Sequence, residues 1–472
     1  MSKTILLNQS DWHFTKENPG IPTAVMGEAI ALPHTWNAVD GQDGGNDYYR
    51  GTCWYTLALA KPAIPAGGKA VLQLDGAAMT AAVYLNGEKL AEHKGGYSTF
   101  RVDLTDHLKE ENLLAISVDN SDNDTVYPQK ADFTFYGGIY RDVTLHIVPA
   151  EHFALPANGA PALKVTPIVT DLAAKTAEVT VEAAVVGAQN VTFALEGQTL
   201  TAPVEKGTAK VVFTLDNAHL WDGVDDPFLY TVSAKLDNGE ETSARFGCRK
   251  FEIDPQKGFI LNGREYPLRG VSRHQDRKGA GNALTNEMME EDISIILEMG
   301  ANTIRLAHYQ HAQYFYDLCD EKGLVIWAEI PYITMHMPNG RANTLTQMEE
   351  LIVQNYNHPC IAVWGLSNEI TAASAVNENL LENHRLLNEL AHKLDPTRKT
   401  TMANVFMLET TSPILEIPDV NSYNLYFGWY LGELEQNDEF FDKYHADYPD
   451  RCIGFSEYGA DANPQYQSSH PE

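Results

Sequence analysis

Short apolar segments, cut by turn residues, fill the first third of the chain. Residues 70–75, 81–85 and 113–118 are apolar or alternate with polar positions over the length of a strand. Asn86-Gly87 follows the second of them, and an Asn-Gly between apolar runs predicts a hairpin turn. Many short strands of this kind are typical of sandwiches and barrels. We therefore predict an all-β sandwich for residues 1–149.

A looser stretch rich in Ala and Pro, residues 151–161, separates this block from a second strand-rich block. There, residues 177–185, 191–195 and 210–215 again have the length and pattern of strands. About 90 residues of short alternating strands fit an immunoglobulin-like sandwich. We assign it to residues 150–252.

The pattern changes after Phe251, where apolar strands alternate with segments of helical periodicity. This alternation indicates βα units around a parallel sheet, as in a (β/α)₈ TIM barrel. The predicted helices are 287–299, 312–322, 378–394 and 430–444. The predicted strands are 268–273, 302–306, 324–328, 361–366, 399–404, 419–424 and 452–455. These are seven strands where a barrel needs eight, so we expect a catalytic domain over 253–472 that lacks its last strand.

Composition and charge exclude several classes of protein. With 44% hydrophobic residues, the chain can form substantial cores. Its net charge of −30 argues against nucleic acid or an anionic membrane as a partner. The five cysteines lack C-x-x-C spacing, and we interpret them as reduced core residues. The first residues contain no apolar signal core, and no apolar run is long enough to span a membrane. We therefore expect a cytoplasmic protein.

Three glutamates lie within three residues of the end of a predicted barrel strand: Glu329, Glu369 and Glu457. Catalytic groups of such barrels stand at the carboxyl ends of strands. A pair of carboxylates there suits glycoside hydrolysis, because one group protonates the leaving oxygen while the other stabilises or captures the sugar cation. By position alone, each of the three could equally cap a helix or hold an ion pair.

Motifs around these glutamates favour the catalytic role over helix capping or ion pairing. The relevant segments are Arg269-Gly-Val-Ser-Arg-His274, Asn302-Thr-Ile-Arg-Leu-Ala-His308, Trp327-Ala-Glu-Ile-Pro331, Trp364-Gly-Leu-Ser-Asn-Glu369 and Ser456-Glu-Tyr-Gly459, with residues 44–51 and 132–142 in the first domain. In this order they resemble glycoside hydrolase family 2, of the β-galactosidase and β-glucuronidase type, and most of all a bacterial β-galactosidase. The resemblance covers essentially the whole chain and implies that the first domain is a jelly-roll, sugar-binding sandwich.

The resemblance implies a role for each matching residue. Glu369 would be the general acid/base and Glu457 the nucleophile. Asn368 would bind the sugar 2-hydroxyl, and Tyr426 would touch the nucleophile. The remaining members of the predicted sugar pocket are His274, His308, His336 and Asp132, the last on a first-domain loop that reaches the barrel mouth. As a lone residue, each histidine would more often be a satisfied, partly buried one.

The resemblance departs from the family pattern at a metal site. Large bacterial β-galactosidases have Glu-x-His after the third strand, where magnesium binds, whereas this chain has Thr334-Met-His336. We therefore predict no protein metal site and no required cofactor. Whether Asp132 shares a monovalent cation such as sodium stays open. No Gly-rich phosphate loop lies between the two glutamates, so no nucleotide is implied.

These observations predict a retaining exo-β-glycosidase that hydrolyses terminal β-D-galactosides of oligosaccharides by double displacement. The alternative within the family is a β-glucuronidase, because Ser-Glu-Tyr-Gly is also close to that subgroup. A third hypothesis is an inactive carbohydrate-binding or assembly fragment, since the predicted barrel is open. The family resemblance also suggests a homo-oligomer.

Overall fold

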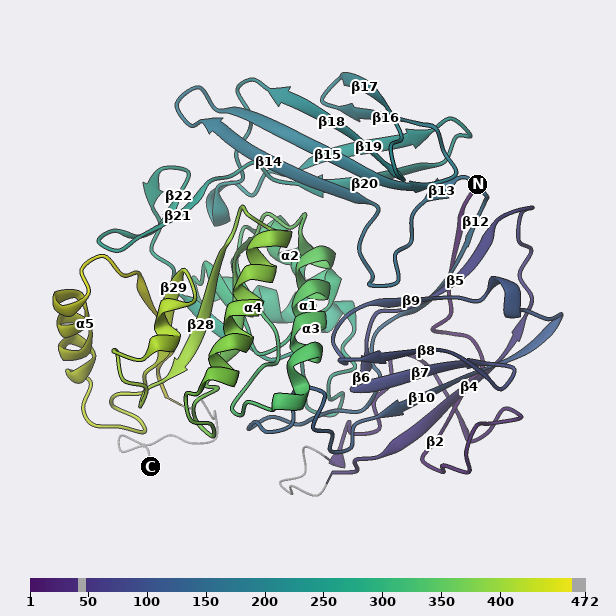
Figure 1. Ribbon diagram of the computed structural model, residues 1–472, viewed down its shortest axis with the longest axis horizontal. Helices are drawn as coiled ribbons and strands as arrows, with labels where there is room; N and C mark the ends of the chain where they lie inside the picture. Colours follow the sequence, from purple (N-terminus) through teal and green to yellow (C-terminus); the bar gives the residue numbers. More distant parts are fainter. Residues whose placement is uncertain (41–47, 461–472) are drawn as a thin grey trace.

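The first unit of the fold is a sandwich of two antiparallel sheets (Figure 1). The computed structural model describes residues 1–40 and 48–460. Part of the sequence motif at 44–51 therefore lies outside the described residues, as does the end of the chain from 461. One sheet has the order β1 (Lys3–Leu6), β12 (Val143–Val148), β5 (Lys69–Leu74) and β9 (Phe100–Asp103). The other has the order β3 (Glu28–Ile30), β2 (Trp12–Thr15), β4 (Thr52–Ala60), β10 (Glu111–Asp119), β7 (Thr80–Leu85) and β8 (Glu88–Lys94).

The predicted hairpin turn is present between β7 and β8. Asn86 and Gly87 both have positive φ, 54° and 86°, which matches the right-handed twist of the strands they join. Inward-facing residues of both sheets, such as Trp12, Tyr55 and Leu72, form the core of this sandwich. A short antiparallel pair, β6 (Ala77–Ala78) and β11 (Gly138–Ile139), forms a separate two-stranded sheet.

The second unit is a smaller sandwich of two four-stranded sheets. The first contains β13 (His152–Phe153), β15 (Thr176–Val186), β14 (Leu163–Asp171) and β18 (Thr208–Leu215). The second contains β17 (Gln198–Pro203), β16 (Asn190–Leu195), β19 (Tyr230–Leu236) and β20 (Glu241–Phe246). Residues along β18 alternate strictly between exposed and buried, so one face packs on the core and the other faces solvent.

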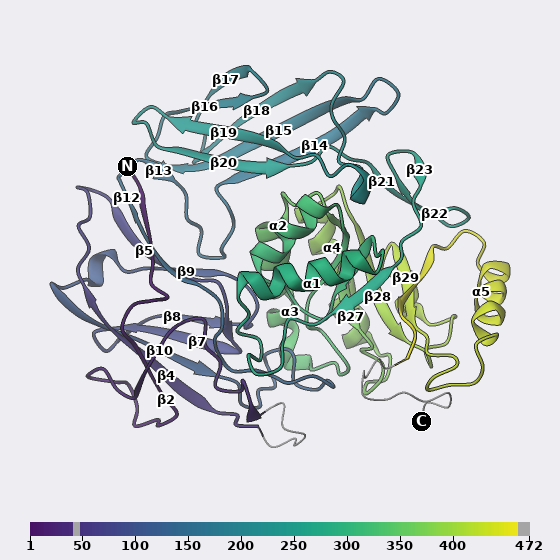
Figure 2. The ribbon, with the colours of Figure 1, turned by 180° about the vertical axis from the view of Figure 1, so that it is seen from behind.

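The third unit is a parallel sheet of seven strands that forms a nearly closed barrel, with the helices outside it (Figure 2). Its strands run in sequence order: β24 (Gly270–Arg273), β25 (Thr303–Leu306), β26 (Val325–Glu329), β27 (Ile361–Asn368), β28 (Lys399–Val405), β29 (Val420–Asn424) and β30 (Ile453–Glu457). The helices are α1 (Asn286–Glu298), α2 (Gln313–Lys322), α3 (Arg341–Asn355), α4 (Glu378–Leu394) and α5 (Gln436–Asp447). The predicted fold class, two β-sandwiches and a TIM-type barrel, is confirmed.

Three details of the sequence prediction need correction. Helix α3 was not predicted, because its inner face is polar: Asn343, Gln347 and Glu350 are buried on it. Helix α5 begins at Gln436 and not at residue 430, since 428–435 form turns. Residues 251–265 form a separate small sheet of β21 (Phe251–Asp254), β22 (Gly258–Leu261) and β23 (Arg264–Glu265) ahead of the barrel.

The polar face of α3 holds the first sandwich against the barrel. Asn343 Oδ1 accepts from the Tyr127 amide at 2.9 Å, and Gln354 Oε1 accepts from the Thr99 amide at 3.1 Å. The His93 ring lies 2.8 Å from Glu350. Because the first two bonds use backbone amides of the sandwich, they fix its orientation relative to the barrel mouth.

Among the described residues, no helix combines the length and apolar character needed to cross a membrane. The five cysteines are free, as predicted; Cys53, Cys248, Cys319 and Cys360 are buried, whereas Cys452, also predicted as a core residue, is only partly buried.

Candidate active site

The carboxyl ends of β26, β27, β29 and β30 bring four polar residues together at one end of the barrel. Glu329 ends β26, Glu457 ends β30, and Glu369 directly follows β27. Asn424, the last residue of β29, is the parallel-strand partner of Glu457. Its side chain donates to Glu369 Oε1 at 2.9 Å. Asn424 thus connects the two predicted catalytic glutamates: it lies opposite Glu457 in the sheet, and its side-chain amide bonds to Glu369.

Arg305 on β25 is the centre of this cluster. Its guanidinium donates to both oxygens of Glu329, at 2.9 and 3.0 Å. It also donates to Glu457 Oε1 at 2.6 Å and to Asn368 Oδ1 at 2.8 Å. The Arg305 side chain is only 5% exposed, and that of Glu329 is fully buried. A rigid, planar fork of donors can hold three acceptors in fixed positions, which a lysine cannot.

Glu457 has a partner at each carboxylate oxygen. Arg305 donates to Oε1, and the Tyr426 hydroxyl donates to Oε2 in a very short hydrogen bond. The structure therefore places the Tyr426 hydroxyl on Glu457, and the catalytic roles of both residues stay predictions. Two donors aimed at one carboxylate fix its orientation.

Glu369 lies in a different electrostatic setting. Burial raises the pKa of its carboxyl, and the charges of Glu457 and Asp132 raise it further, whereas the Asn424 hydrogen bond and His308 oppose them. Its backbone has φ of 45°, a left-handed conformation that is costly for a residue other than glycine and that occurs preferentially at functional sites. The two carboxyls thus differ, one held by cationic and hydroxyl donors and one biased toward its protonated form.

Glu329 is an ion-pair residue and not a free acid. Burial opposes its ionisation, but Arg305 and His308 outweigh this and lower its pKa below the usual range. His308 Nδ1 donates to Glu329 Oε1 at 2.6 Å, while Nε2 lies 3.7 Å from Glu457 Oε1. Glu329 therefore anchors both Arg305 and His308 from beneath the site.

The first sandwich reaches this cluster through a loop after β10. Phe133 packs its ring 5.0 Å from that of His274 and 6.0 Å from that of His308. The two histidine rings meet edge-on at 5.2 Å. Burial, followed by the neighbouring His308, lowers the pKa of His274 to about 3, so this ring is neutral. Asp132, at the exposed tip of the same loop, acts electrostatically on Glu369.

His336 is the predicted site residue that the structure places apart from the carboxylates. Its ring nitrogens pair with the Tyr332 hydroxyl at 2.6 Å and with Asn379 on α4 at 2.7 Å. Thr334, in the place of the family's magnesium-binding glutamate, has φ of 63° and bonds through its amide to the Asn368 carbonyl. A sugar-pocket role for His336 stays a prediction.

Sequence reasoning missed Arg305 and Asn424, although both lie in segments that it singled out. The signal for Arg305 was a charged residue inside an otherwise apolar strand, because a buried arginine requires carboxylate partners. Asn424 carried no comparable signal. Its importance depends on the parallel pairing of β29 and β30, which the sequence does not state.

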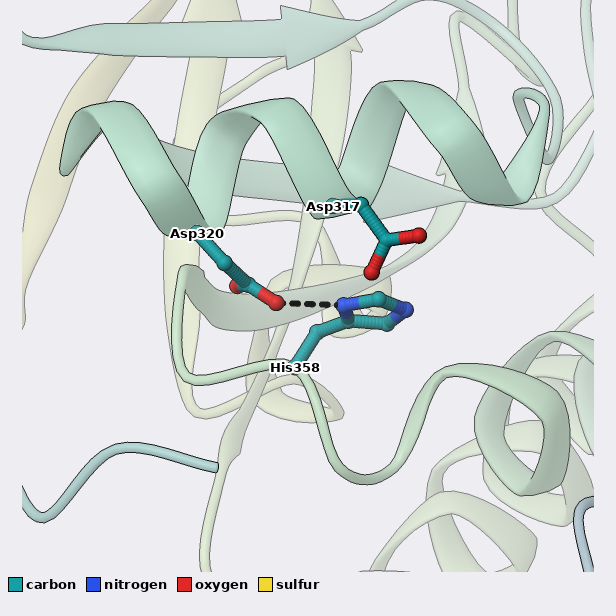
Figure 3. Close-up of side chains that lie close together, drawn as sticks. All are labelled: Asp317, Asp320 and His358. Carbon is teal, nitrogen blue, oxygen red and sulfur yellow. Dashed lines mark hydrogen bonds and ion pairs between the residues drawn. The ribbon is translucent and has the colours of Figure 1, made fainter. Parts of the chain in front are cut away.

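A group of possible metal ligands lies elsewhere, on α2 and the loop before β27 (Figure 3). Asp317, Asp320 and His358 offer ligand atoms within 4.8 Å of one another. However, Asp320 Oδ2 accepts from His358 at 2.6 Å and Oδ1 from the Cys360 amide at 3.0 Å. Asp317 pairs with Arg245 of the second sandwich at 2.9 Å. These side chains already satisfy each other, so the cluster is a structural ion-pair network.

Family models match this chain over nearly its whole length. The glycosyl hydrolases family 2 sugar binding domain matches residues 26–149, and the family 2 model itself matches 157–249. The family 2 TIM barrel domain matches 252–469. The chain belongs to glycoside hydrolase family 2. The resemblance carried by the sequence motifs is thereby confirmed.

Individual family 2 relatives carry two substrate names. A β-glucuronidase of Bacteroides fragilis is 36% identical over 98% of this chain and 69% of its own length. A β-galactosidase of Thermoanaerobacter pseudethanolicus is 31% identical over 79% of this chain and 51% of its own. Among solved structures, an FMN-binding β-glucuronidase from Facaelibacterium prausnitzii L2-6 superposes with a TM-score of 0.93 at 43% identity, over all of this chain and 74% of that one. The chain thus spans about half to three quarters of these relatives.

Proposed function

We propose that this protein is a retaining exo-β-glycosidase that hydrolyses terminal β-D-glucuronides by double displacement. The observation that carries the proposal is the asymmetry of the two carboxyls. Glu457 accepts from Arg305 and Tyr426, whereas burial raises the pKa of Glu369. A retaining glycosidase needs one ionised and one protonated carboxyl, about 5–5.5 Å apart.

In the first step Glu457 attacks the anomeric carbon while Glu369 gives its proton to the leaving oxygen. The glycosidic bond breaks and an ester bond to Glu457 forms. In the second step Glu369, now ionised, takes a proton from a water on the face that the leaving group vacated. The water oxygen bonds to the anomeric carbon opposite Glu457, and the ester bond to Glu457 breaks. Asn368 binds the 2-hydroxyl, with its own amide oxygen held by Arg305. His274, His308 and Asp132 complete the sugar pocket.

The choice of glucuronide over galactoside rests on the relatives. Both the B. fragilis protein and the superposed F. prausnitzii structure carry the name β-glucuronidase. The galactoside preference expected from the sequence remains a second candidate, supported by the T. pseudethanolicus β-galactosidase. Both reactions use only the side chains named above, so we propose that neither requires a metal or an organic cofactor.

The test is hydrolysis of 4-nitrophenyl β-glucuronide and 4-nitrophenyl β-galactoside by the purified protein. Cleavage of the glucuronide, abolished by Glu457→Gln, is the expected result. Glu389→Gln is the matched control, because Glu389 is exposed on the outer face of α4. Galactoside cleavage alone would make the second candidate correct. Failure to cleave either aryl glycoside would contradict the proposal.

A further inference from the structure

A buried serine–histidine pair lies directly behind the predicted acid/base residue. Ser367 on β27 and His384 on α4 are 1% and 0% exposed, and the Ser367 hydroxyl lies 2.8 Å from His384 Nε2. His384 Nδ1 lies 2.9 Å from the Leu380 carbonyl oxygen. Only Asn368 separates Ser367 from Glu369 along the chain. Neither Ser367 nor His384 takes part in the reaction steps described above.

The chemistry of the two side chains fixes the direction of these hydrogen bonds. A carbonyl oxygen only accepts, so His384 Nδ1 carries a proton and donates it to Leu380. Burial lowers the pKa of His384 to about 4, so the ring is neutral at neutral pH and its Nε2 has no proton. Nε2 therefore accepts from the Ser367 hydroxyl. The serine is thus held by a ring whose own proton is committed to the backbone of α4.

The pair lies in the layer between the barrel sheet and its helices. Asn368 points into the barrel, where its amide oxygen accepts from Arg305. Successive side chains of a strand point to opposite faces, so Ser367 points outward to α4. Much of the inner face of α4 is apolar, with Leu380 and Leu387 fully buried. A polar pair in such a layer is costly unless its members bond to each other, so the bond favours one position of α4 relative to the end of β27.

The strand end that the pair holds is irregular. Between Gly365 and Asn368, β27 contains one residue more than the facing part of β28, which is a β-bulge. The next residue, Glu369, has its left-handed φ of 45°, a costly conformation that persists only where neighbouring contacts hold it. The Glu369 amide donates to the Ala403 carbonyl at 2.8 Å, which fixes it to the neighbouring strand. The Ser367 hydroxyl fixes the bulge to the helix layer as well.

We propose that Ser367 and His384 are positioning residues, which hold the Glu369 carboxyl where it can protonate the leaving oxygen. The proposal rests on the proposed function and adds two residues that act on its acid without touching the sugar. Loss of the pair would let the bulge relax, and the carboxyl would move away from Asn424, to which it bonds at 2.9 Å. The first step would then lack its proton donor, while Glu457 on β30 would keep its place.

The test compares two aryl glycosides of the sugar that the protein cleaves. A dinitrophenyl glycoside releases a stable anion that needs no proton, whereas a phenyl glycoside requires the acid. The value of kcat/KM reports the first step, in which the leaving group departs. We expect Ser367→Ala and His384→Leu to lower kcat/KM at least about tenfold for the phenyl glycoside and less than about threefold for the dinitrophenyl glycoside.

Two variants separate positioning from a general loss of stability. His384→Gln keeps an acceptor for the Ser367 hydroxyl and should restore the wild-type ratio of the two kcat/KM values to within about threefold. Thr400→Ala is the matched control, because the buried Thr400 hydroxyl at the start of β28 donates to Asn388 of α4 at 2.5 Å. It should lower the free energy of unfolding without changing that ratio.

An equal loss for both glycosides in Ser367→Ala and His384→Leu would overturn the proposal, as would the same change of ratio in Thr400→Ala. If the wild type hydrolyses no aryl glycoside, the proposed function fails, and crystal structures of the two pair variants decide the positioning. A Glu369 carboxyl displaced by about 1 Å from Asn424 would support it. A carboxyl that keeps the 2.9 Å bond in both variants would overturn it.

Discussion

Replacing Arg305 with lysine tests whether one guanidinium organises the site. Arg305 makes four donor contacts, two to Glu329, one to Glu457 and one to Asn368. Lysine keeps the charge but concentrates its donors at a single nitrogen. At least two charge-assisted hydrogen bonds should therefore be lost, each contributing about 1.5–3 kcal/mol. Since Glu329 is fully buried, its weakened pairing adds to this cost.

We expect Arg305→Lys to lower the free energy of unfolding by about 3 kcal/mol, since two bonds at the lower limit of about 1.5 kcal/mol are lost. Its kcat should fall about 100-fold, the effect typical of a misplacement of about 1 Å. Urea unfolding and aryl glycoside turnover measure the two effects. Arg385→Lys is the control, because Arg385 pairs with Glu378 and Glu382 on the exposed side of α4, and this variant should keep the stability and turnover of the wild type. A variant that keeps kcat within about threefold and unfolding within about 1 kcal/mol would refute the reasoning.

Three further predictions concern Asn424, Glu329 and the need for a metal. Asn424→Ala removes the hydrogen bond that lowers the Glu369 pKa, so the alkaline limb of the kcat–pH profile should move to higher pH; an unmoved limb would contradict this. Because folding lowers the pKa of Glu329, its ionisation stabilises the fold at pH values above the pKa that Glu329 has in the unfolded chain, and this stability is lost as the pH falls through the folded pKa. As the pH falls below about 4.5, the free energy of unfolding measured in urea should therefore drop less for Glu329→Gln than for the wild type. Dialysis against EDTA should leave aryl glycoside turnover unchanged; a tenfold loss restored by Mg²⁺ would show that a metal is required.

The parts of the fold that follow apolar periodicity were predictable from the sequence. Six sandwich strands are of this kind, namely β5, β7, β10, β15, β16 and β18, and so is α4, whose observed bounds match the predicted ones. Helix α3 was missed because its buried face consists of Asn343, Gln347 and Glu350, which pack against backbone groups of another domain. A buried polar helix face of this kind can be recognised only when the position of the partner domain is known.

The candidate site divides in the same way. Glu369 and Glu457 were found because they follow apolar strands within recognisable motifs. Asn424 was missed because its two partners, Glu369 and Glu457, are 55 and 33 residues away and meet it only through the sheet. The contact of Phe133 with His274 depends on a loop from one domain reaching the barrel of another, which no local pattern predicts.

The most direct test of the double-displacement account is to trap the glycosyl-enzyme. The protein is incubated with the 2-deoxy-2-fluoro β-glycoside of the sugar it cleaves, activated by a dinitrophenyl leaving group, then digested and analysed by mass spectrometry. We predict one sugar per chain, attached to Glu457 as an ester, and no label in Glu457→Gln. Label on Glu369 or Glu329, or release of a product with inverted anomeric configuration from the unlabelled glycoside, would contradict the account.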